Sequence, residues 1–282
     1  MSIALVTGAN QGLGRAVAEL LARRLEDGST VYLSGRNAER VTEAASAIPG
    51  AEPLVLDVSD DQDVAEAARL IRERHGGIDL VVSNAAARRS ADRSDAETIR
   101  EFVETNNLGT SRMIREFGPL VRTGGRFLIV ASAFGSLRYL DPALWHLFDT
   151  ETRDLADIDR VMLEYADLVE AGKDHEAGWP ASINTVSKIG QVASARIFAR
   201  TDAAARGIYI GAVCPGLVDT EASRPWFTDM SQAQTPEAAA VDVVSLAVDP
   251  IDPAVVGQLV QHRVVIGWTT GMDGDPQQPD RR

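Results

Sequence analysis

The chain has 282 residues, of which 45% are hydrophobic, enough for one large α/β domain or two smaller ones. Its 41 acidic residues exceed its 28 basic residues, and the net charge of −13 argues against the basic surface that a nucleic-acid partner requires. The single cysteine, Cys214, excludes an internal disulfide and fits a reducing compartment as a packed thiol.

The N-terminal segment contains one short apolar run, IALV at residues 3–6. This run is far shorter than a membrane span or the apolar part of a signal peptide, and no cleavage site follows it. We therefore expect a cytoplasmic protein that has no membrane partner.

Short apolar runs alternate with amphipathic stretches along the chain, which is the pattern of a parallel sheet covered by helices. The predicted strands are Ile3–Thr7, Thr30–Ser34, Glu52–Asp57, Ile78–Ser83, Arg126–Ala131, Ile208–Cys214 and Gln258–His262. The predicted helices are Leu13–Leu25, Ala38–Ala47, Asp61–Arg74, Ala96–Phe117, Ile183–Ala205 and Pro236–Val248. This order predicts an α/β fold with a doubly wound, seven-stranded parallel sheet in a single domain over residues 1–270. The polar tail, residues 271–282, is expected to be disordered.

Residues 137–181 lie between the fifth strand and the next helix, and they are more numerous than a connecting loop requires. Within this insertion, apolar residues recur at spacings of three and four from Leu155 to Val169, and Gly172 follows where a helix C-cap is expected. The insertion therefore predicts a helix that packs against the domain by one face.

The segment TGANQGLGR, residues 7–15, follows the first strand and opens the first helix. In that position Gly8 permits a tight turn, Gly12 lets the backbone approach a pyrophosphate, and Gly14 permits close helix packing. The helix N-terminus adds N–H groups and the positive end of its dipole. The segment predicts a dinucleotide-binding cradle.

The second predicted strand ends without the acidic residue that binds the ribose 2′-hydroxyl of NAD. Arg36 stands there instead and is placed to meet a 2′-phosphate, so the pattern favours NADP. The alternative is that Arg36 is a solvated loop arginine.

These motifs resemble the short-chain dehydrogenase/reductase family over nearly the whole chain, and the family has a Rossmann fold. TGANQGLG is similar to its TGxxxGxG motif, while LDV at 56–58, SNAA at 83–86 and CPG at 214–216 resemble its adenine-side, NNAG and nicotinamide-side segments. The resemblance implies cofactor-binding roles for Gly8, Asn10, Gln11, Gly12, Leu13, Gly14, Arg36, Asp57, Val58, Asn84, Lys188, Pro215, Gly216 and Val218.

NNLG at 106–109 resembles the active-site asparagine motif of this family, and VASAFG at 130–135 resembles the segment that carries its catalytic serine. The resemblance therefore implies catalytic roles for Asn106 and Ser132, without a metal. The insertion, AGWP at 177–180 and KIG at 188–190 look most like the monomeric carbonyl reductase branch. That likeness implies a monomer, because such an insertion covers a helix face that other members use for oligomerisation.

In the family pattern YxxxK, a tyrosine phenol protonates the substrate oxygen, and the lysine lowers the pKa of that phenol. The segment SINTVSK, residues 182–188, retains Lys188 but has Asn184 at the tyrosine position. General acid catalysis is worth ~10²–10⁴-fold, so its loss is serious. An amide still donates a hydrogen bond to a developing oxyanion, and we therefore include Asn184 among the expected site residues.

Three hypotheses about function remain open. In the first, the protein is an NADPH-dependent oxidoreductase, and the proton comes from water, from Ser132 backed by Lys188, or from a side chain of the insertion. The side chains considered are Tyr139, His146, Tyr165 and His175. In the second, NADP is retained for a non-redox step such as cyclisation, dehydration or isomerisation. The third is a cofactor-binding pseudoenzyme.

The substrate is expected to be a bulky small-molecule carbonyl compound, because a large insertion and apolar side chains are predicted near the pocket. These side chains are Phe134, Leu217, Trp226 and Phe227, for which packing in the core is the alternative. Quinones and enones are expected in particular, because hydride addition gives them a delocalised anion for which the missing acid matters less. Arg88, Arg89 and Arg93 follow the fourth predicted strand, where they either steer an anionic ligand or belong to a solvated loop.

Overall fold

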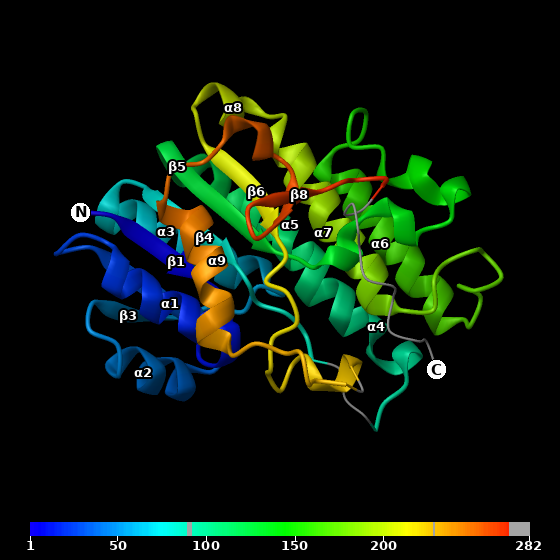
Figure 1. The fold of residues 1–282 in the computed structure, drawn as a ribbon, viewed down its shortest axis with the longest axis horizontal. Coiled ribbons are helices and arrows are strands. Elements are labelled where there is room, and N and C mark those ends of the chain that lie inside the picture. The colour runs from blue at the N-terminus through cyan, green and yellow to red at the C-terminus, as the bar shows by residue number, and fades with distance from the viewer. Residues whose placement is uncertain (89–91, 228, 271–282) are drawn as a thin grey trace.

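The computed structural model describes residues 1–88, 92–227 and 229–270, so the predicted tail lies outside the described residues. Eight strands form one sheet in the order β3-β2-β1-β4-β5-β6-β7-β8 (Figure 1). Strands β1 to β7 are parallel, and β8 is antiparallel to β7. The strands are β1 (Ile3–Val6), β2 (Thr30–Gly35), β3 (Ala51–Val55), β4 (Ile78–Ser83), β5 (Val121–Val130), β6 (Tyr209–Val213), β7 (Leu259–Gln261) and β8 (Val264–Ile266).

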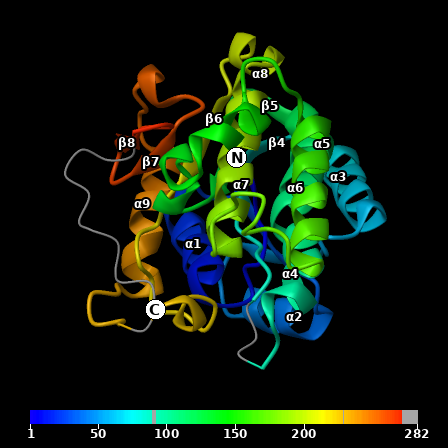
Figure 2. The same ribbon diagram turned by 90° about the vertical axis from the view of Figure 1, so that its right-hand side faces the viewer.

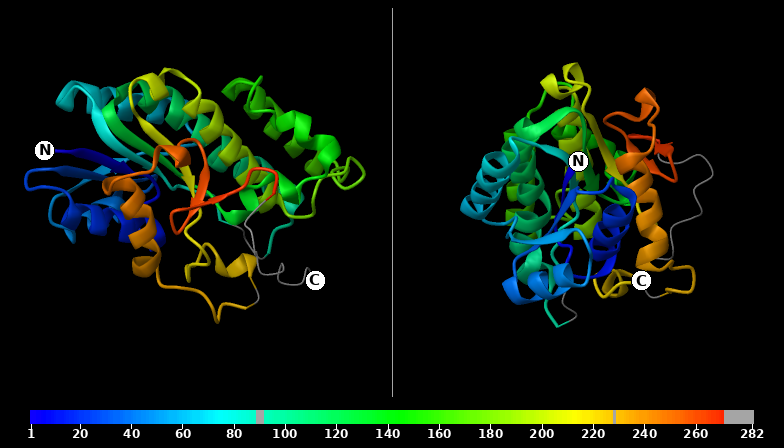
Figure 3. Two further views of the ribbon diagram at one scale, coloured as in Figure 1. Left: turned by 45° about the horizontal axis from the view of Figure 1, so that its top comes forward. Right: turned by 90° about the vertical axis from the view of Figure 1, so that its left-hand side faces the viewer.

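Helices cover both faces of this sheet (Figure 3). The helices are α1 (Gly12–Arg24), α2 (Ala38–Ser46), α3 (Asp61–His75), α4 (Asp95–Val103), α5 (Gly109–Phe117), α6 (Leu155–Glu170), α7 (Ile183–Ala199), α8 (Asp202–Ala205) and α9 (Pro236–Val248). The apolar sides of α1, α2 and α9 pack on one face, and those of α3, α5 and α7 pack on the other. Across the described ranges, no helix is both long and apolar enough to span a bilayer.

Burial on both faces explains why the strands read as continuous apolar runs. In β5, Phe127 and Ile129 belong to the core on the α3 side, whereas Leu128 and Val130 belong to the core on the α1 side. The chain winds outward in opposite directions from β1 and β4, which lie side by side. The carboxyl ends of these strands therefore flank the crevice where doubly wound sheets bind their ligands.

The eighth strand is an addition to the seven predicted. It follows β7 through a two-residue turn in which His262 and Arg263 have φ values of 49° and 62°. Such hairpin turns favour Asn-Gly or Asp-Gly, because few other residues adopt positive φ without strain. The sequence His-Arg therefore gives no hairpin signal.

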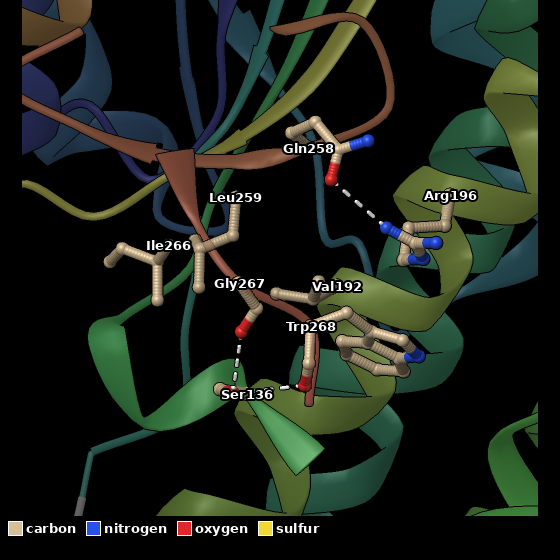
Figure 4. Close-up of a pocket in the computed structure, with 8 residues that line it drawn as sticks. All are labelled: Ser136, Val192, Arg196, Gln258, Leu259, Ile266, Gly267 and Trp268. Atoms are coloured by element: carbon tan, nitrogen blue, oxygen red, sulfur yellow. Dashed lines mark hydrogen bonds between the residues drawn. The ribbon is translucent and has the colours of Figure 1, made fainter. Parts of the chain in front are cut away.

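The chain beyond β8 is fixed to the segment that follows β5. The Ser136 hydroxyl lies 2.8 and 2.9 Å from the carbonyl oxygens of Gly267 and Trp268 (Figure 4). The Trp268 carbonyl also accepts a hydrogen bond from the Leu137 N–H, at 2.7 Å. These bonds hold the chain after β8 beside α7.

Two predicted helices are interrupted in the structure. The helix expected over Ala96–Phe117 consists of α4, a π-helical segment at Glu104–Leu108, and α5. The helix expected over Ile183–Ala205 ends at Ala199, where the Thr201 hydroxyl donates to the Phe198 carbonyl at 2.7 Å and competes with helix continuation. Apolar periodicity continues through both interruptions, so the pattern alone does not reveal them.

The insertion forms the predicted helix, α6, which lies along α4 and α7 (Figure 2). It begins with a capping box made by Asp154 and Asp157, and Gly172 follows its end with a φ of 65°. Its buried face contains Ile158, Val161, Met162, Tyr165 and Val169. At the rim, Arg100 of α4 binds Asp167 and Glu170 of α6 at 2.6 and 2.7 Å. The prediction of a helix docked by one face is confirmed.

Tyr165 provides a test of this packing. Its ring is fully buried against Trp179, with centroids 4.7 Å apart, and its hydroxyl has no hydrogen-bond partner among the described residues. Because a buried, unpaired hydroxyl is destabilising, we predict that Tyr165→Phe raises the free energy of unfolding by about 1 kcal/mol. Tyr165→Ala should lower it by roughly 3–5 kcal/mol. Denaturant titration measures both, and a loss of stability in Tyr165→Phe would contradict this description.

Candidate functional site

The turn between β1 and α1 has the geometry of an anion cradle. Gly8 and Gly12 have φ values of 62° and 55°, which residues with a side chain rarely adopt. A Cβ on Gly14 would lie 2.5 Å from the Asn84 side chain, so only glycine lets α1 approach β4 this closely. The N-cap residue Gln11 makes no side-chain capping bond, and the helix N-terminus is left for an anion.

The end of β4 is hydrogen-bonded to this cradle. The Asn84 amide donates to the carbonyl oxygens of Thr7 and Gly8 at 2.9 and 3.3 Å. The Thr7 hydroxyl accepts from the N–H groups of Asn84 and Ala85 at 2.9 and 3.0 Å. Asn84 therefore acts on the cradle by fixing its backbone.

The residues expected on the adenine side lie at the ends of β2 and β3. Arg36 is exposed directly after β2, and within the described ranges no hydrogen bond or ion pair holds its guanidinium. A Cβ on Gly35 would lie 3.1 Å from the Asn10 side-chain oxygen, so Asn10 is close to the same strand end. Asp57 accepts hydrogen bonds from the Ser59 N–H and hydroxyl at 2.9 and 2.6 Å. Val58 is buried beside it.

The segment after β6 lies over the cradle from the opposite side. Gly216 has a φ of 76°, and the Pro215 carbonyl accepts from the Gln234 amide at 2.6 Å. A Cβ on Gly12 would lie 3.4 Å from the Thr220 methyl group, which places Thr220 beside the cradle. Thr220 carries no signal in the sequence, because only the fold brings it beside Gly12. Val218 is buried within this segment.

Asn106 lies in the π-helical segment between α4 and α5 and is fully buried. Its side-chain oxygen accepts from the Ala87 N–H at 2.8 Å, and its amide donates to the Ser187 hydroxyl at 3.3 Å. Asn106 thereby joins the loop after β4 to α7. Single-turn π-helical segments occur frequently at functional sites, where they re-aim the residues they contain.

The loop after β5, which carries Ser132, packs on α7 near Lys188. The Ser132 hydroxyl accepts from the Phe134 N–H at 3.3 Å, and a Cβ on Gly135 would lie 2.9 Å from the Lys188 carbonyl oxygen. Asn184 stands in the first turn of α7, half-buried, one turn before Lys188 and on the same helix face. The loop that carries Ser132 thus lies close to α7 at Lys188, and the catalytic roles expected for Ser132, Asn184 and Lys188 stay predictions.

The Lys188 ammonium group is held by neutral acceptors. It donates to the Val130 carbonyl at 3.2 Å and to the Gln191 side-chain oxygen at 2.8 Å. Burial lowers the pKa of Lys188 to about 8, and the nearby Cys214 partly opposes this shift. Gln191 is not among the residues predicted for the site, although its i+3 spacing from Lys188 on one helix is a signal that could have identified it.

Cys214 is a packed thiol, as expected. It is buried immediately after β6, and burial raises the pKa of its thiol above the ordinary value. A neutral thiol is a poor nucleophile.

The four side chains of the insertion that were considered as proton donors lie in different surroundings. Tyr165 lies in the core of the insertion, and His175 is exposed 3.6 Å from Asp174. His146 is exposed at a hollow of about 330 Å³ that includes Arg196, two turns beyond Lys188 on α7. The Tyr139 ring contacts Phe134, two residues after Ser132, with centroids 5.5 Å apart. Tyr139 is therefore the donor nearest to the loop that carries Ser132.

Aromatic rings line the protein beside Ser132. Phe134 and Phe227 are stacked, with centroids 6.4 Å apart and an interplanar angle of 20°. Trp226 instead packs edge-on against Phe102 of α4 at 5.6 Å, and Leu217 is half-buried. Phe134 and Phe227 thus form an apolar wall at the end of β5.

The arginines after β4 are engaged with the protein. Arg88 binds Glu221 at 2.9 Å, and Arg93 binds Glu101 at 3.4 Å. Arg89 lies outside the described residues. These ion pairs favour the solvated-loop interpretation for Arg88 and Arg93, and the first of them joins the loop after β4 to the segment after β6.

Comparison with known proteins agrees with this geometry. The family model described as short chain dehydrogenase matches residues 2–142. Carbonyl reductase (NADPH) 1 of Bos taurus is 31% identical over 278 residues, which cover 94% of this chain and 98% of that protein. Carbonyl reductase (NADPH) 3 of Homo sapiens is also 31% identical, with the same coverage of both chains. Salutaridine reductase from Papaver somniferum has a similar fold, with a TM-score of 0.80 at 24% identity over 92% of this chain and 99% of its own.

The pKa of Lys188 predicts how stability changes with pH. Its value is about 8 in the folded protein against an ordinary 10.5, so between these pH values the unfolded chain holds more protons than the folded one. Stability due to this group therefore rises with pH across that window. We predict that the difference in unfolding free energy, Lys188→Met minus wild type, is largest below pH 8 and falls as the pH approaches 10. Denaturant titrations at several pH values measure it, and a constant difference would contradict the burial of this charge.

Proposed function

The chain belongs to the short-chain dehydrogenase family as an oxidoreductase, and on that premise we propose that it uses NADPH to reduce conjugated carbonyl compounds, quinones and enones above all. Asn184 carries this proposal. It stands in the first turn of α7, one turn before Lys188, where it offers a neutral hydrogen-bond donor that cannot release a proton near neutral pH. A site of this kind stabilises an anion without protonating it.

The residues present fit NADPH. The glycine turn and the uncapped α1 N-terminus provide for the pyrophosphate, and Arg36 is exposed at the end of β2 without a protein partner among the described residues. The relatives named carbonyl reductase (NADPH) support the same cofactor. When bound, NADPH supplies a hydride.

The residues of the site determine which substrates can be reduced without a positioned proton donor. Ser132 and Asn184 donate neutral hydrogen bonds toward a substrate oxygen, and the Lys188 ammonium adds positive charge behind them. A simple ketone becomes an alkoxide, a strong base that needs a proton as it forms. A quinone or an enone becomes a phenolate or an enolate, whose negative charge is delocalised. Such an anion persists until solvent protonates it.

The walls of the site favour a flat, bulky substrate. Phe134 and Phe227 present stacked rings next to Ser132, and Tyr139 continues the wall from Phe134. Aromatic side chains bind planar conjugated ligands through offset stacking and burial of apolar surface.

We also propose that the protein is a monomer. Helix α6 lies along α4 and α7, so the insertion occupies a face that would otherwise be available for helix pairing between subunits. Light scattering coupled to size exclusion should therefore give a mass near 30.3 kDa at micromolar concentration. A stable species of twice or four times that mass would refute this proposal.

Arg36 provides the test of the cofactor. A guanidinium forms a charge-assisted hydrogen-bonded pair with a ribose 2′-phosphate, which NADH lacks. We predict that NADPH binds at least about tenfold more tightly than NADH, and that Arg36→Ala removes most of this difference. Calorimetric titration of both cofactors gives the affinities. Arg40, an exposed arginine on α2, gives a matched control in Arg40→Ala, and equal loss in the two variants would argue against a specific role for Arg36.

Asn184→Tyr provides the test of the reaction. A tyrosine at this position introduces a positioned acid, so we predict that it raises the reduction of a simple ketone by about 10²-fold or more. Reduction of a quinone should change much less. Steady-state rates on one ketone and one quinone measure both effects, and Asn184→Phe controls for ring size without a hydroxyl. If the tyrosine variant folds, binds NADPH and gains nothing on ketones, Asn184 does not face the reacting carbonyl.

A further inference from the structure

Gln191 is the side chain that holds the ammonium group of Lys188 from within α7. The Lys188 Nζ donates to the Gln191 Oε1 at 2.8 Å and to the Val130 carbonyl at 3.2 Å. A lysine ammonium has three N–H donors, so these two bonds leave one donor for a cofactor or substrate. Gln191 is 2% exposed, and it reaches Lys188 entirely within the protein.

The hydrogen bond made by the Gln191 NH₂ group determines that the side-chain oxygen of Gln191 faces Lys188. The Gln191 Nε2 lies 3.2 Å from the Thr110 hydroxyl oxygen, and that hydroxyl donates to the Asn106 carbonyl at 2.6 Å. Because the Thr110 proton is committed to Asn106, its oxygen accepts, and Gln191 must present its NH₂ group there. The Gln191 oxygen therefore faces Lys188. Thr110 and Asn106 are buried as well, at 3% and 0% exposed.

No negative charge compensates Lys188 within the described ranges. On its own helix it faces Gln191, β5 contributes the Val130 carbonyl, and α5 contributes Thr110 behind Gln191. The titratable group that faces it is the Cys214 thiol after β6, whose pKa is raised by burial. A glutamate has nearly the same shape as glutamine, and in this place it would form an ion pair with the ammonium.

We propose that Gln191 is a positioning residue for Lys188, a neutral acceptor that fixes the ammonium at the site while leaving its positive charge uncompensated. This inference rests on the proposed function, in which an anion forms on the substrate, no tyrosine protonates it, and the charge of Lys188 stabilises it. A neutral acceptor at this position leaves the positive charge of Lys188 available to stabilise the anion on the substrate. An acidic side chain would accept the same hydrogen bond but would neutralise that charge.

The chain allows a direct test, because Lys173 and Lys188 are its two lysines. Protein labelled with ¹³C-lysine should give two side-chain NMR signals, and Lys173, exposed after α6, is an internal reference. We expect Gln191→Glu to raise the pKa of Lys188 by roughly 1–3 pH units through the new opposite charge, and Gln191→Met to lower it by removing an acceptor. Gln258→Glu, which changes a residue bonded to Arg196 farther along α7, should leave it unchanged.

The same three variants are then assayed with NADPH and a quinone at pH 7. We expect Gln191→Glu to lower kcat by about tenfold or more, since it neutralises one stabilising charge, and Gln258→Glu to leave kcat unchanged. An unchanged Lys188 titration in both Gln191 variants would overturn the proposal, as would an unaltered kcat in Gln191→Glu. If the pKa moves as expected but none of the proteins, wild type included, consumes NADPH, Gln191 positions Lys188 and the proposed function is wrong.

Discussion

The Lys188 ammonium group is the point on which the site depends. Its hydrogen bonds join α7 to the end of β5, and through Gln191 and Thr110 they reach the backbone of Asn106. A buried charge is costly unless polar partners surround it, so these elements are held in one arrangement. The same cost lowers the pKa of Lys188 to about 8, so the charge of this side chain changes with pH just above neutrality.

The parallel sheet determines where the loops of the candidate cofactor site lie. Every parallel strand ends at the same edge, so the turn after β1, the Asn84 loop and the Gly216 loop meet there. Glycines at two left-handed positions let the backbone of the cradle approach a ligand, and Thr220 lies beside one of them. In the proposed function, backbone N–H groups of the cradle meet the pyrophosphate and Arg36 meets the 2′-phosphate, whereas side chains of α7 and of the loop after β5 meet the charge that forms on the substrate.

Much of this arrangement could be predicted from the sequence, because local patterns determine it. Apolar strand runs indicated seven strands, and spacing indicated α6. The β8 hairpin was missed because His262 and Arg263 give no turn signal, and the π-helical segment was missed because it preserves apolar periodicity. Contacts between distant segments were also out of reach, among them Thr220 beside Gly12. Gln191 is different, because its spacing from Lys188 was visible in the sequence. Its role became apparent only because no carboxylate pairs with Lys188 in the part of the chain that the structure describes.

The central claim is that hydride reaches a conjugated acceptor at this site without a proton moving at the same time. Single-turnover reduction of a quinone by the NADPH-loaded enzyme, followed by NADPH absorbance in H₂O and in D₂O, tests it most directly. The account predicts loss of absorbance at rates that are nearly equal in the two solvents, and slower rates with NADPH deuterated at the transferred position. A several-fold slower reaction in D₂O would show that a positioned acid still operates, and no loss of absorbance would contradict reduction altogether.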